Sequence, residues 1–284
     1  MSKLNNLVSS LYYVTCYVLK NYNNIFVQFV YHLAILQSRF FYLSCFLSPL
    51  LFLRTILAID FCDVKSCHGK RHIGCNNNMM FEDSCLRFHD LVNMQLFKQY
   101  LLGLHNEYRQ DVASSLFVDL PPALKMPELV WDDYLSVVAE YHLKRCEMEL
   151  PDDTCLATDD FADPHFNYAE DFYPRPLVRQ SNVRQMTILS EQWMDELFEM
   201  DDIGSENVES EIGNIINDQS AYMGCAAGRD YDLWNIHFIL ICYYSSGPPK
   251  KGNLYEEGNF NASLCPHGKS DGYPNLCKTL TLND

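Results

Sequence analysis

The clearest pattern of apolar and polar positions lies in the last third of the chain. Over residues 234–243, every second side chain is apolar or aromatic, a period of two that is typical of a β-strand. The side chains between them include two polar ones, at 235 and 237, and are otherwise apolar or aromatic as well. A short apolar run at 222–227 precedes this strand, and turn-forming residues occupy 228–232. We therefore predict a β-hairpin that brings Cys225 and Cys242 close enough to bridge. Because both faces of the second strand are apolar, we expect it to lie mid-sheet, covered on each side.

Three segments upstream have the period of a helix. The first begins after residue 91 and stops before Pro121, the second has Asp132 as its N-cap and ends before Pro151, and the third runs over 182–200. Their inward-facing positions are Met94, Phe97, Leu101, His105, Tyr108 and Val112; Leu135, Val138, Ala139, His142, Leu143 and Cys146; and Met186, Leu189, Trp193, Glu196 and Leu197.

The segments between these helices are acidic and broken by prolines. Residues 150–176 read as a long loop with a short extended piece at 166–172, and an acidic loop leads from the third helix into the hairpin. Helices on both sides of a small sheet predict an α+β fold of the three-layer α-β-α sandwich type.

The chain divides by composition into four parts. Residues 1–58 contain no Asp or Glu, and their third uncharged run has the length of a signal-peptide core, so we predict a signal peptide at about 40–58; an anchored form that uses 21–38 is the alternative. Residues 59–90 are cysteine-rich without periodicity, which predicts a loop held by bridges rather than by a core. A domain at 91–246 and a C-terminal extension at 247–284 follow.

Charge excludes one class of partner. After residue 58 the chain has 17 basic against 37 acidic residues, and therefore a net charge of −20. So acidic a body argues against nucleic-acid binding, which depends on a basic face. Two acidic clusters, at 147–171 and 191–211, lack the D-x-[DN]-x-[DN]-G pattern of a calcium loop, and we interpret them as solvated surface.

Cysteine usage indicates an oxidising compartment. Ten of the twelve cysteines follow residue 60, an even set behind an apolar leader, which predicts an extracellular disulfide framework. Zinc is the competing use, but no CxxC pair occurs. Asn261 begins an Asn-Ala-Ser glycosylation sequon. His68, His72 and His89 are interpreted as surface histidines rather than metal ligands.

Several motifs, in order, resemble the CAP superfamily of cysteine-rich secretory proteins, antigen-five allergens and pathogenesis-related proteins, and most of all its insect antigen-five branch. The motifs are His105-Asn-Glu-Tyr-Arg109; Met126-Pro-Glu-Leu-Val-Trp-Asp132; Trp193-Met-Asp-Glu196; Met223-Gly-Cys-Ala226; Cys242-Tyr-Tyr244; Gly252-Asn253; and Tyr255-Glu-Glu-Gly258. The resemblance covers about 61–277. It implies the α-β-α fold and a set of disulfide pairs: Cys62–Cys75, Cys67–Cys155, Cys85–Cys146, Cys225–Cys242 and Cys265–Cys277.

The resemblance also implies a central cleft, which in many members carries two histidines and two acidic residues able to hold zinc. Here the four positions fall at Leu150, near Asp171, at Glu196 and at Glu211, so both imidazoles are missing. We therefore expect a degenerate cleft with no metal and no cofactor, in which crowded carboxylates repel and at least one has a raised pKa unless they splay into water.

We expect no catalytic residue. His105, His142 and His237 fit apolar helix or strand patterns and are interpreted as core histidines, and no nucleophile has a recognisable setting such as G-x-S-x-G. The leading hypothesis is a secreted, non-catalytic protein that binds an unknown extracellular protein or lipid, with membrane contact only if the leader is retained. A lipid or sterol carrier is the alternative, and a divalent-metal-dependent protein or hydrolase using Glu196, Asp171 and Glu211 is a third.

Overall fold

The computed structural model describes residues 61–282, apart from 117–119, 176–179, 201 and 205–209. The predicted signal peptide and anchor lie outside the described residues. Within the described part, no helix combines the length and the apolar character needed to cross a bilayer.

One sheet organises the described chain, in the strand order β2-β6-β7-β5, with β3 pairing in parallel to β6. Its strands are β2 (Phe88–Leu91), β3 (Val130–Trp131), β5 (His165–Pro174), β6 (Tyr222–Tyr231) and β7 (Asn235–Tyr244). A separate parallel pair joins β1 (Arg71–His72) to β4 (Thr154–Cys155). The predicted hairpin is confirmed as β6–β7, and the short extended piece expected at 166–172 is part of β5.

The hairpin is longer than predicted, and its turn lies elsewhere. Residues 228–231 continue β6, because β2 pairs with them from Leu91↔Gly228 to Phe88↔Tyr231 and satisfies their backbone on that edge. The turn falls at residues 232–234, between the paired residues Tyr231 and Ile236. The prediction of a turn at 228–232 is therefore wrong, and Trp234 belongs to the turn rather than to the strand.

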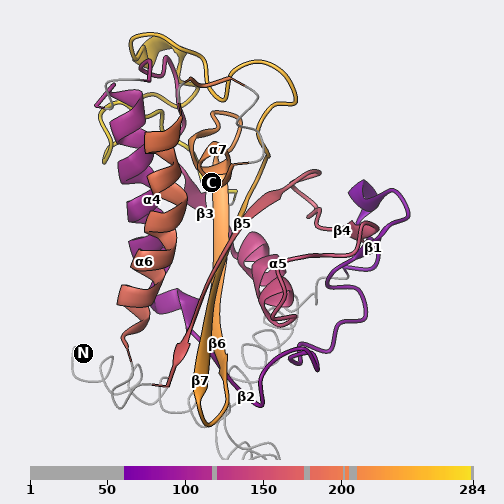
Figure 1. Ribbon diagram of the computed structural model, residues 1–284. Helices are drawn as coiled ribbons and strands as arrows, with labels where there is room; N and C mark the ends of the chain where they lie inside the picture. Colours follow the sequence, from indigo (N-terminus) through magenta and orange to yellow (C-terminus); the bar gives the residue numbers. More distant parts are fainter. Residues whose placement is uncertain (1–60, 117–119, 176–179, 201, 205–209, 283–284) are drawn as a thin grey trace, which may run out of the picture. The chain divides into compact units, whose positions relative to one another are not determined.

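Helices cover both faces of this sheet (Figure 1). They are α4 (Lys98–Ala113), α5 (Asp133–Leu143), α6 (Asn182–Asp195) and α7 (Glu211–Ile216). Alternate β7 residues divide between two cores. Phe238, Leu240, Cys242 and Tyr244 pack with α4, α6 and α7, whereas Ile239, Ile241 and Tyr243 pack with α5. The prediction of a mid-sheet strand in a three-layer α-β-α sandwich is confirmed.

Helix α5 lies directly on β6 at Gly224. A Cβ atom at this position would collide with the backbone nitrogen of Ser136 and the carbonyl oxygen of Asp132, so only glycine permits this approach. Ser136 Oγ donates to Cys225 O at 2.8 Å, and Asp132 Oδ1 accepts from Leu135 N at 2.7 Å as the predicted N-cap.

The helix boundaries differ from the predicted ones in two places. The third helix ends at Asp195 and continues as a 3₁₀ turn, η4 (Glu196–Glu199), and the pattern before α4 forms a separate 3₁₀ turn, η3 (Met94–Leu96). Helix α7 is not among the predicted elements, because its six residues follow an acidic stretch that predicts a loop.

The cysteine-rich segment packs on the α5 core. Phe61 and Val64 are buried, and Phe61 stacks on His72 with ring centroids 4.6 Å apart and meets the edge of Tyr141 at 5.5 Å. The expectation of a loop held only by bridges is therefore wrong, as is that of a surface His72, which is 2% exposed. A 3₁₀ turn, η2 (Lys65–Cys67), also forms here.

Disulfides join the ten cysteines of this part in the five pairs that the resemblance implies. Cys225 and Cys242 are direct cross-strand partners in β6 and β7. In the C-terminal part, which contains η6 (Ala262–Leu264), Cys277 exchanges backbone hydrogen bonds with Met126 and Glu128, both of 2.8 Å.

The buried guanidinium of Arg109 joins α4 to three other segments. It is 0% exposed and donates five hydrogen bonds to carbonyl oxygens: two to Pro127 and one each to Ile215, Asn217 and Ser220, at 2.7–3.1 Å. Burial lowers the pKa of Arg109 to about 9, so the group still carries its charge at pH 7. The charge is satisfied by the dipoles of four backbone carbonyls.

Arg109→Met should lower the free energy of unfolding by about 3–5 kcal/mol, because four buried carbonyls lose their donor. Chemical denaturation of the purified protein measures this loss. Arg184→Met, at an exposed position of α6, is the matched control and should change stability by less than about 0.5 kcal/mol. Equal effects of the two variants would show that the carbonyls find other partners.

Candidate functional site

The candidate site lies where η4 and the start of α7 meet the sheet edge formed by β5. Glu196 and Glu211 are hydrogen bonded through their carboxyl groups, and Ile212 N donates to Glu196 Oε2 at 3.0 Å. Burial, together with the hydrogen bond to Glu211, raises the pKa of Glu196 to about 7. The raised pKa favours the protonated form of Glu196, which lessens the repulsion between the two carboxyl groups.

Local sequence explains how each carboxylate reaches this place. Ser210 caps α7, its side chain accepting from Gly213 N at 3.2 Å, so Glu211 stands in the first helical turn, where a negative charge is favourable. Glu196 follows the last turn of α6, whose buried Trp193 fixes the helix on the sheet and donates to Tyr168 O at 3.4 Å.

A chain of buried amides and hydroxyls connects this pair to α4. Asn167 Nδ2 donates to Glu211 O at 2.9 Å and to Tyr244 Oη at 3.3 Å, and Asn214 Nδ2 donates to Asn167 Oδ1 at 2.8 Å. The chain continues through a 2.9 Å hydrogen bond from Tyr244 Oη to His105 Nε2. Neither asparagine is among the residues predicted from the sequence. The one local signal is the extended pattern at 166–172, which contains Asn167.

His105 is a structural residue of this network. It is 0% exposed, and its second nitrogen, Nδ1, is hydrogen bonded to Leu101 O at 2.8 Å. Burial lowers the pKa of His105 to about 4, so the imidazole is neutral and has no free nitrogen. His142 is likewise buried, with a pKa lowered to about 4 by burial and with hydrogen bonds to Tyr243 Oη and Met148 O. The interpretation of both as core histidines is confirmed.

The structure does not bring Asp171 to the pair. Asp171 Oδ2 instead accepts from Gln185 Nε2 on α6, at 3.5 Å. The β5 residue that faces Glu211 is Asn167, and four residues of extended strand separate it from Asp171 by about 13 Å. The expectation of Asp171 near the cleft is therefore wrong. It rests on local similarity of the Tyr-Ala-Glu-Asp stretch, whereas the β5 residue that contacts Glu211 is Asn167, four positions earlier.

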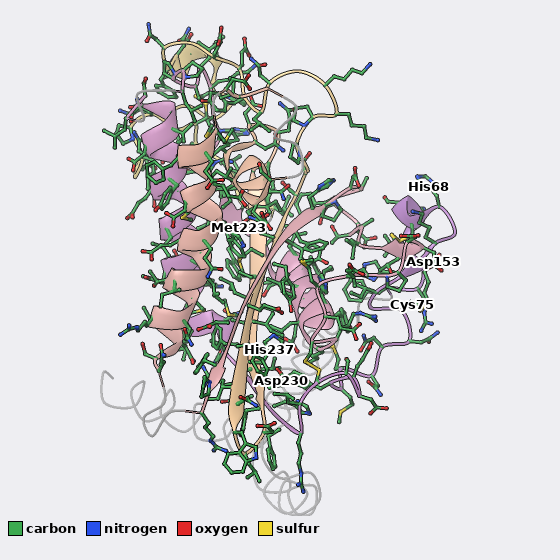
Figure 2. The ribbon with its side chains drawn as sticks, viewed as in Figure 1. His68, Cys75, Asp153, Met223, Asp230 and His237 are labelled. Atoms are coloured by element: carbon green, nitrogen blue, oxygen red, sulfur yellow. A yellow bond between two sulfur atoms is a disulfide. The ribbon has the colours of Figure 1, made fainter. Side chains whose placement is uncertain are left out.

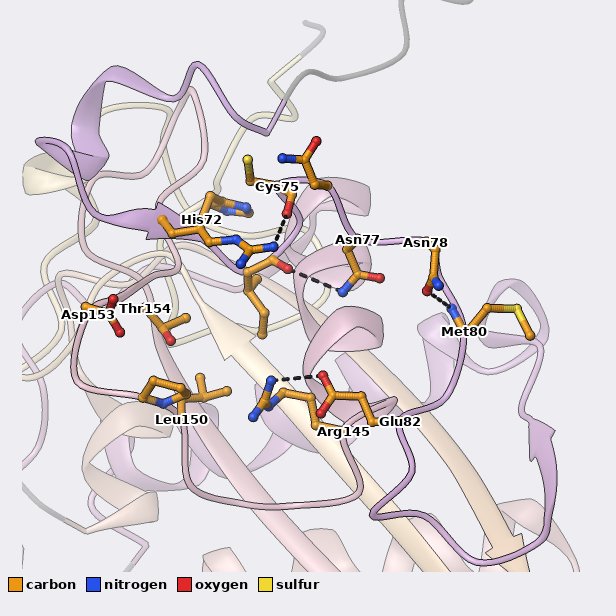
Figure 3. Close-up of a pocket in the computed structure, with 14 residues that line it drawn as sticks. His72, Cys75, Asn77, Asn78, Met80, Glu82, Arg145, Leu150, Asp153 and Thr154 are labelled. Carbon is orange, nitrogen blue, oxygen red and sulfur yellow. Dashed lines mark hydrogen bonds and ion pairs between the residues drawn. The ribbon is translucent and has the colours of Figure 1, made fainter.

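Leu150 lies instead on the wall of a surface cavity of about 360 Å³ between the cysteine-rich segment and the loop after α5 (Figure 3). Arg71, Arg145, Glu82 and Asp153 line the same cavity. Both guanidinium groups are engaged there: Arg145 Nη1 donates to Glu82 Oε1 at 3.0 Å, and Arg71 Nη2 donates to Cys75 O at 3.2 Å. Neither Glu196 nor Glu211 borders this cavity, so only two of the four predicted cleft positions meet.

These residues do not fit a zinc ion. Zinc is held mainly by imidazole and thiolate, whereas here the donor groups are two carboxyl groups, and Glu196 already accepts a backbone N–H. Among the described residues, the donor atoms of Cys85, Cys146 and Asp230 also lie within 4.8 Å of one another, but the two sulfur atoms form a disulfide and cannot ligate.

A second charged cluster, which the sequence did not predict, lies on the opposite half of the sheet. His237 lies between two carboxylates, with Nδ1 2.8 Å from Asp230 Oδ1 and Nε2 3.0 Å from Glu170 Oε2; Figure 2 shows His237 beside Asp230. Burial lowers the pKa of His237, but hydrogen bonds to the two carboxylates outweigh it and raise the pKa overall. The interpretation as an ordinary core histidine is incomplete, because cross-strand register, not local pattern, supplies these partners.

Comparison with known proteins bears on the whole arrangement. The profile described as "CAP: Cysteine-rich secretory protein family" matches residues 102–244, half of the chain. The chain belongs to the CAP family. Its His105-Asn106…Arg109 motif, the Glu196 position and the Cys225–Cys242 bridge all lie in the matched part of this CAP protein.

Relatives and solved structures agree with this assignment. The CAP protein is 26% identical over 227 residues to Venom allergen-1 of Aedes aegypti, covering 77% of this chain and 87% of the relative. It is 27% identical over 258 residues to Tabinhibitin 2 of Tabanus yao, covering 86% and 95%. The solved structure of BmVAL-1 shares the fold, with a TM-score of 0.55 at 16% identity over 71% of this chain and all of that one.

Glu196→Gln should make the CAP protein more stable at pH 8 but change its stability little at pH 5. The folded-state pKa of Glu196 is raised from 4.5 to about 7, so its contribution is fully present below pH 4.5 and is lost as the pH rises through 7. Glutamine keeps a hydrogen-bond donor at every pH. Thermal unfolding followed by circular dichroism at pH 5 and pH 8 measures the difference, with the exposed Glu199→Gln as control. A gain in melting temperature that is the same at both pH values would contradict the raised pKa of Glu196.

Proposed function

We propose that this CAP protein is an extracellular, non-catalytic binding protein whose central polar cluster stabilises the fold instead of performing chemistry. The observation that carries the proposal is the Glu196–Glu211 pair. The two carboxyl groups are hydrogen bonded to each other, and Glu196 Oε2 also accepts from Ile212 N in the first turn of α7, so the pair makes structural contacts within the fold.

The rest of the network supports the same conclusion. A general base must reach the proton that it removes, and the imidazole that this network contains, His105, is enclosed with both nitrogens hydrogen bonded. Asn167 and Tyr244 are occupied in the same way. The cluster is connected like a packed polar core, in which satisfied groups fix one arrangement of the elements.

The disulfides and the relatives support the extracellular part of the proposal. Five disulfides in 222 consecutive residues, 61–282, suit an oxidising compartment and not the reducing cytosol. The relatives Venom allergen-1 and Antigen 5 like allergen Cul n 1 of Culicoides nubeculosus are named as allergens. The partner that we propose is an extracellular protein or a lipid, bound by the domain at 91–246.

The protein secreted from expressing cells should hydrolyse neither peptide nor ester substrates above background, with or without added Zn²⁺, Ca²⁺ or Mg²⁺. Glu196→Ala should leave this background unchanged, because the pair has no catalytic role. Glu199→Ala is the matched control on the same 3₁₀ turn.

Hydrolysis that Glu196→Ala abolishes and Glu199→Ala preserves would overturn the proposal. Native mass spectrometry of the same sample tests the alternatives: we expect the mass of the chain with five disulfides and its glycan. A reproducible extra mass of a lipid or a metal would favour the carrier or the metal-dependent protein.

Asn261 should carry an N-linked glycan if the protein is exported. The sequon lies at the exposed start of η6, where Asn261 Oδ1 accepts from Ser263 N at 3.1 Å and from Ser263 Oγ at 2.7 Å. Treatment with a peptide N-glycosidase should lower the mass of the wild type and leave Asn261→Gln unchanged. A secreted wild type without glycan would count against modification at this site.

A further inference from the structure

The turn of the β6–β7 hairpin presents two large apolar side chains to solvent. Leu233 is 70% exposed and Trp234 is 75% exposed, whereas Trp193, in the core, is 2% exposed. Figure 1 shows the turn beyond the ends of α5 and α6, so neither helix covers it. Both side chains leave apolar surface in contact with water. Binding that covers this surface would be favourable.

The backbone of this turn is held firmly, although its side chains are exposed. Asp232 Oδ1 accepts from the N–H groups of both Trp234 and Asn235 at 2.7 Å. Arg175, which follows β5, donates from its backbone N to Trp234 O at 2.6 Å and from Nη1 to Asp232 O at 3.2 Å. A turn ordered in advance loses little conformational entropy when its side chains enter another medium.

Aromatic side chains form a collar behind the turn. Tyr231 ends β6 and its ring lies 5.5 Å from that of Phe88 on β2, which is 39% exposed. Phe172 on β5 is 60% exposed, and its ring lies 5.8 Å from that of His237. We call Phe88, Phe172, Tyr231, Leu233 and Trp234 the hairpin tip. Strands β2, β5 and β6 contribute to it: Phe88 and Tyr231 lie on one face of the sheet's end, and Phe172 lies on the other.

Two guanidinium groups stand on this collar. Arg87 lies over the Phe88 ring at 5.2 Å, and Arg175 lies over the Tyr231 ring at 5.3 Å. Arg175 also donates to the turn, so the cations flank the aromatic rings at the level of the turn. Membrane interfaces combine the same three kinds of group: apolar side chains enter the acyl region, aromatic rings lie at the headgroups, and arginine reaches the phosphates.

Charge identifies the kind of surface. The chain after residue 58 has a net charge of −20, which an anionic bilayer would repel. At the tip itself, the Arg87 and Arg175 guanidinium groups stand beside the Asp232 carboxylate, whose pKa is lowered by the Trp234 and Asn235 N–H groups. A phosphocholine headgroup is complementary to these groups. Its phosphate can contact Arg87 and Arg175, and its quaternary ammonium can contact Asp232 and the aromatic rings.

A protein partner fits the tip less well. Stable protein interfaces bury about 800 Å² on each side, over 20–30 residues. A three-residue turn with a narrow collar offers a small fraction of that area, and it protrudes, whereas a bilayer surface needs no complementary shape.

We propose that the hairpin tip inserts into the interface of a phosphocholine bilayer, with Leu233 and Trp234 as the penetrating side chains. This inference deepens the proposed binding function by naming the partner, and it rests on that function being non-catalytic. The contact is peripheral and reversible, because two side chains enter instead of a membrane span.

The test compares variants of the full secreted protein on vesicles of palmitoyl-oleoyl phosphatidylcholine, by co-sedimentation and by tryptophan emission. Leu233→Ser with Trp234→Ser should weaken partitioning at least about tenfold, since burying each side chain is worth more than the 1.4 kcal/mol that a factor of ten requires. Leu96→Ser with Phe198→Ser, two residues that are each 73% exposed outside the tip, is the matched control and should bind as the wild type does.

Trp234→Phe separates insertion from misfolding. Phenylalanine keeps the apolar contact, so binding should stay within about threefold, whereas the blue shift of emission and the quenching by spin-labelled lipid seen with the wild type should disappear. All variants should keep the wild-type melting temperature, because Asp232 and Arg175, which hold the turn, are unchanged.

Three results would overturn the proposal: no binding to phosphatidylcholine vesicles, equal binding by the Leu233→Ser, Trp234→Ser variant, or binding that strengthens as phosphatidylserine is added. Concentration-dependent dimerisation that this variant abolishes, without vesicle binding, would assign the tip to a second copy of the chain. None of these results touches the proposed non-catalytic role, which fails only through hydrolysis that depends on Glu196.

Discussion

The buried guanidinium of Arg109 is the interaction on which the central arrangement depends. It connects α4 to the segment before β3, to the end of α7 and to the start of β6 through five hydrogen bonds to carbonyl oxygens. Its planar set of donors can serve several acceptors at once, which a lysine ammonium cannot do in the same geometry. Removing a charge from water is costly, and the carbonyl oxygens of Pro127, Ile215, Asn217 and Ser220 offset this cost.

Neighbouring residues of the same helical motif extend this connection. Asn106 exchanges two hydrogen bonds with the backbone of Leu129, from its Nδ2 to Leu129 O and from Leu129 N to its Oδ1, and His105 reaches Tyr244 on β7. Arg109 and Asn106 thus supply partners to backbone groups that these segments would otherwise leave unpaired, and His105 joins the helix to the sheet through a side chain. This explains why a motif with a histidine in it serves architecture here and not catalysis.

Disulfides hold what the apolar cores alone would leave loose. Cys67–Cys155 spans 88 residues and ties the cysteine-rich segment to the short β1–β4 sheet, and closing so long a loop contributes about 3–5 kcal/mol by limiting the unfolded chain.

The sequence by itself determined the class of fold and its main elements. Alternation over 234–243 identified a strand with two apolar faces, and helical spacing identified α4, α5 and α6, because these patterns record burial that repeats along one element. Only the tertiary structure decided which groups meet. Glu196 and Glu211 are fifteen positions apart, Asn167 takes the place expected for Asp171, and Asp230 pairs with His237 through strand register. The turn moved to 232–234 because β2, distant in sequence, pairs with the end of β6. Contacts of this kind arise from packing between elements, and no local pattern encodes them.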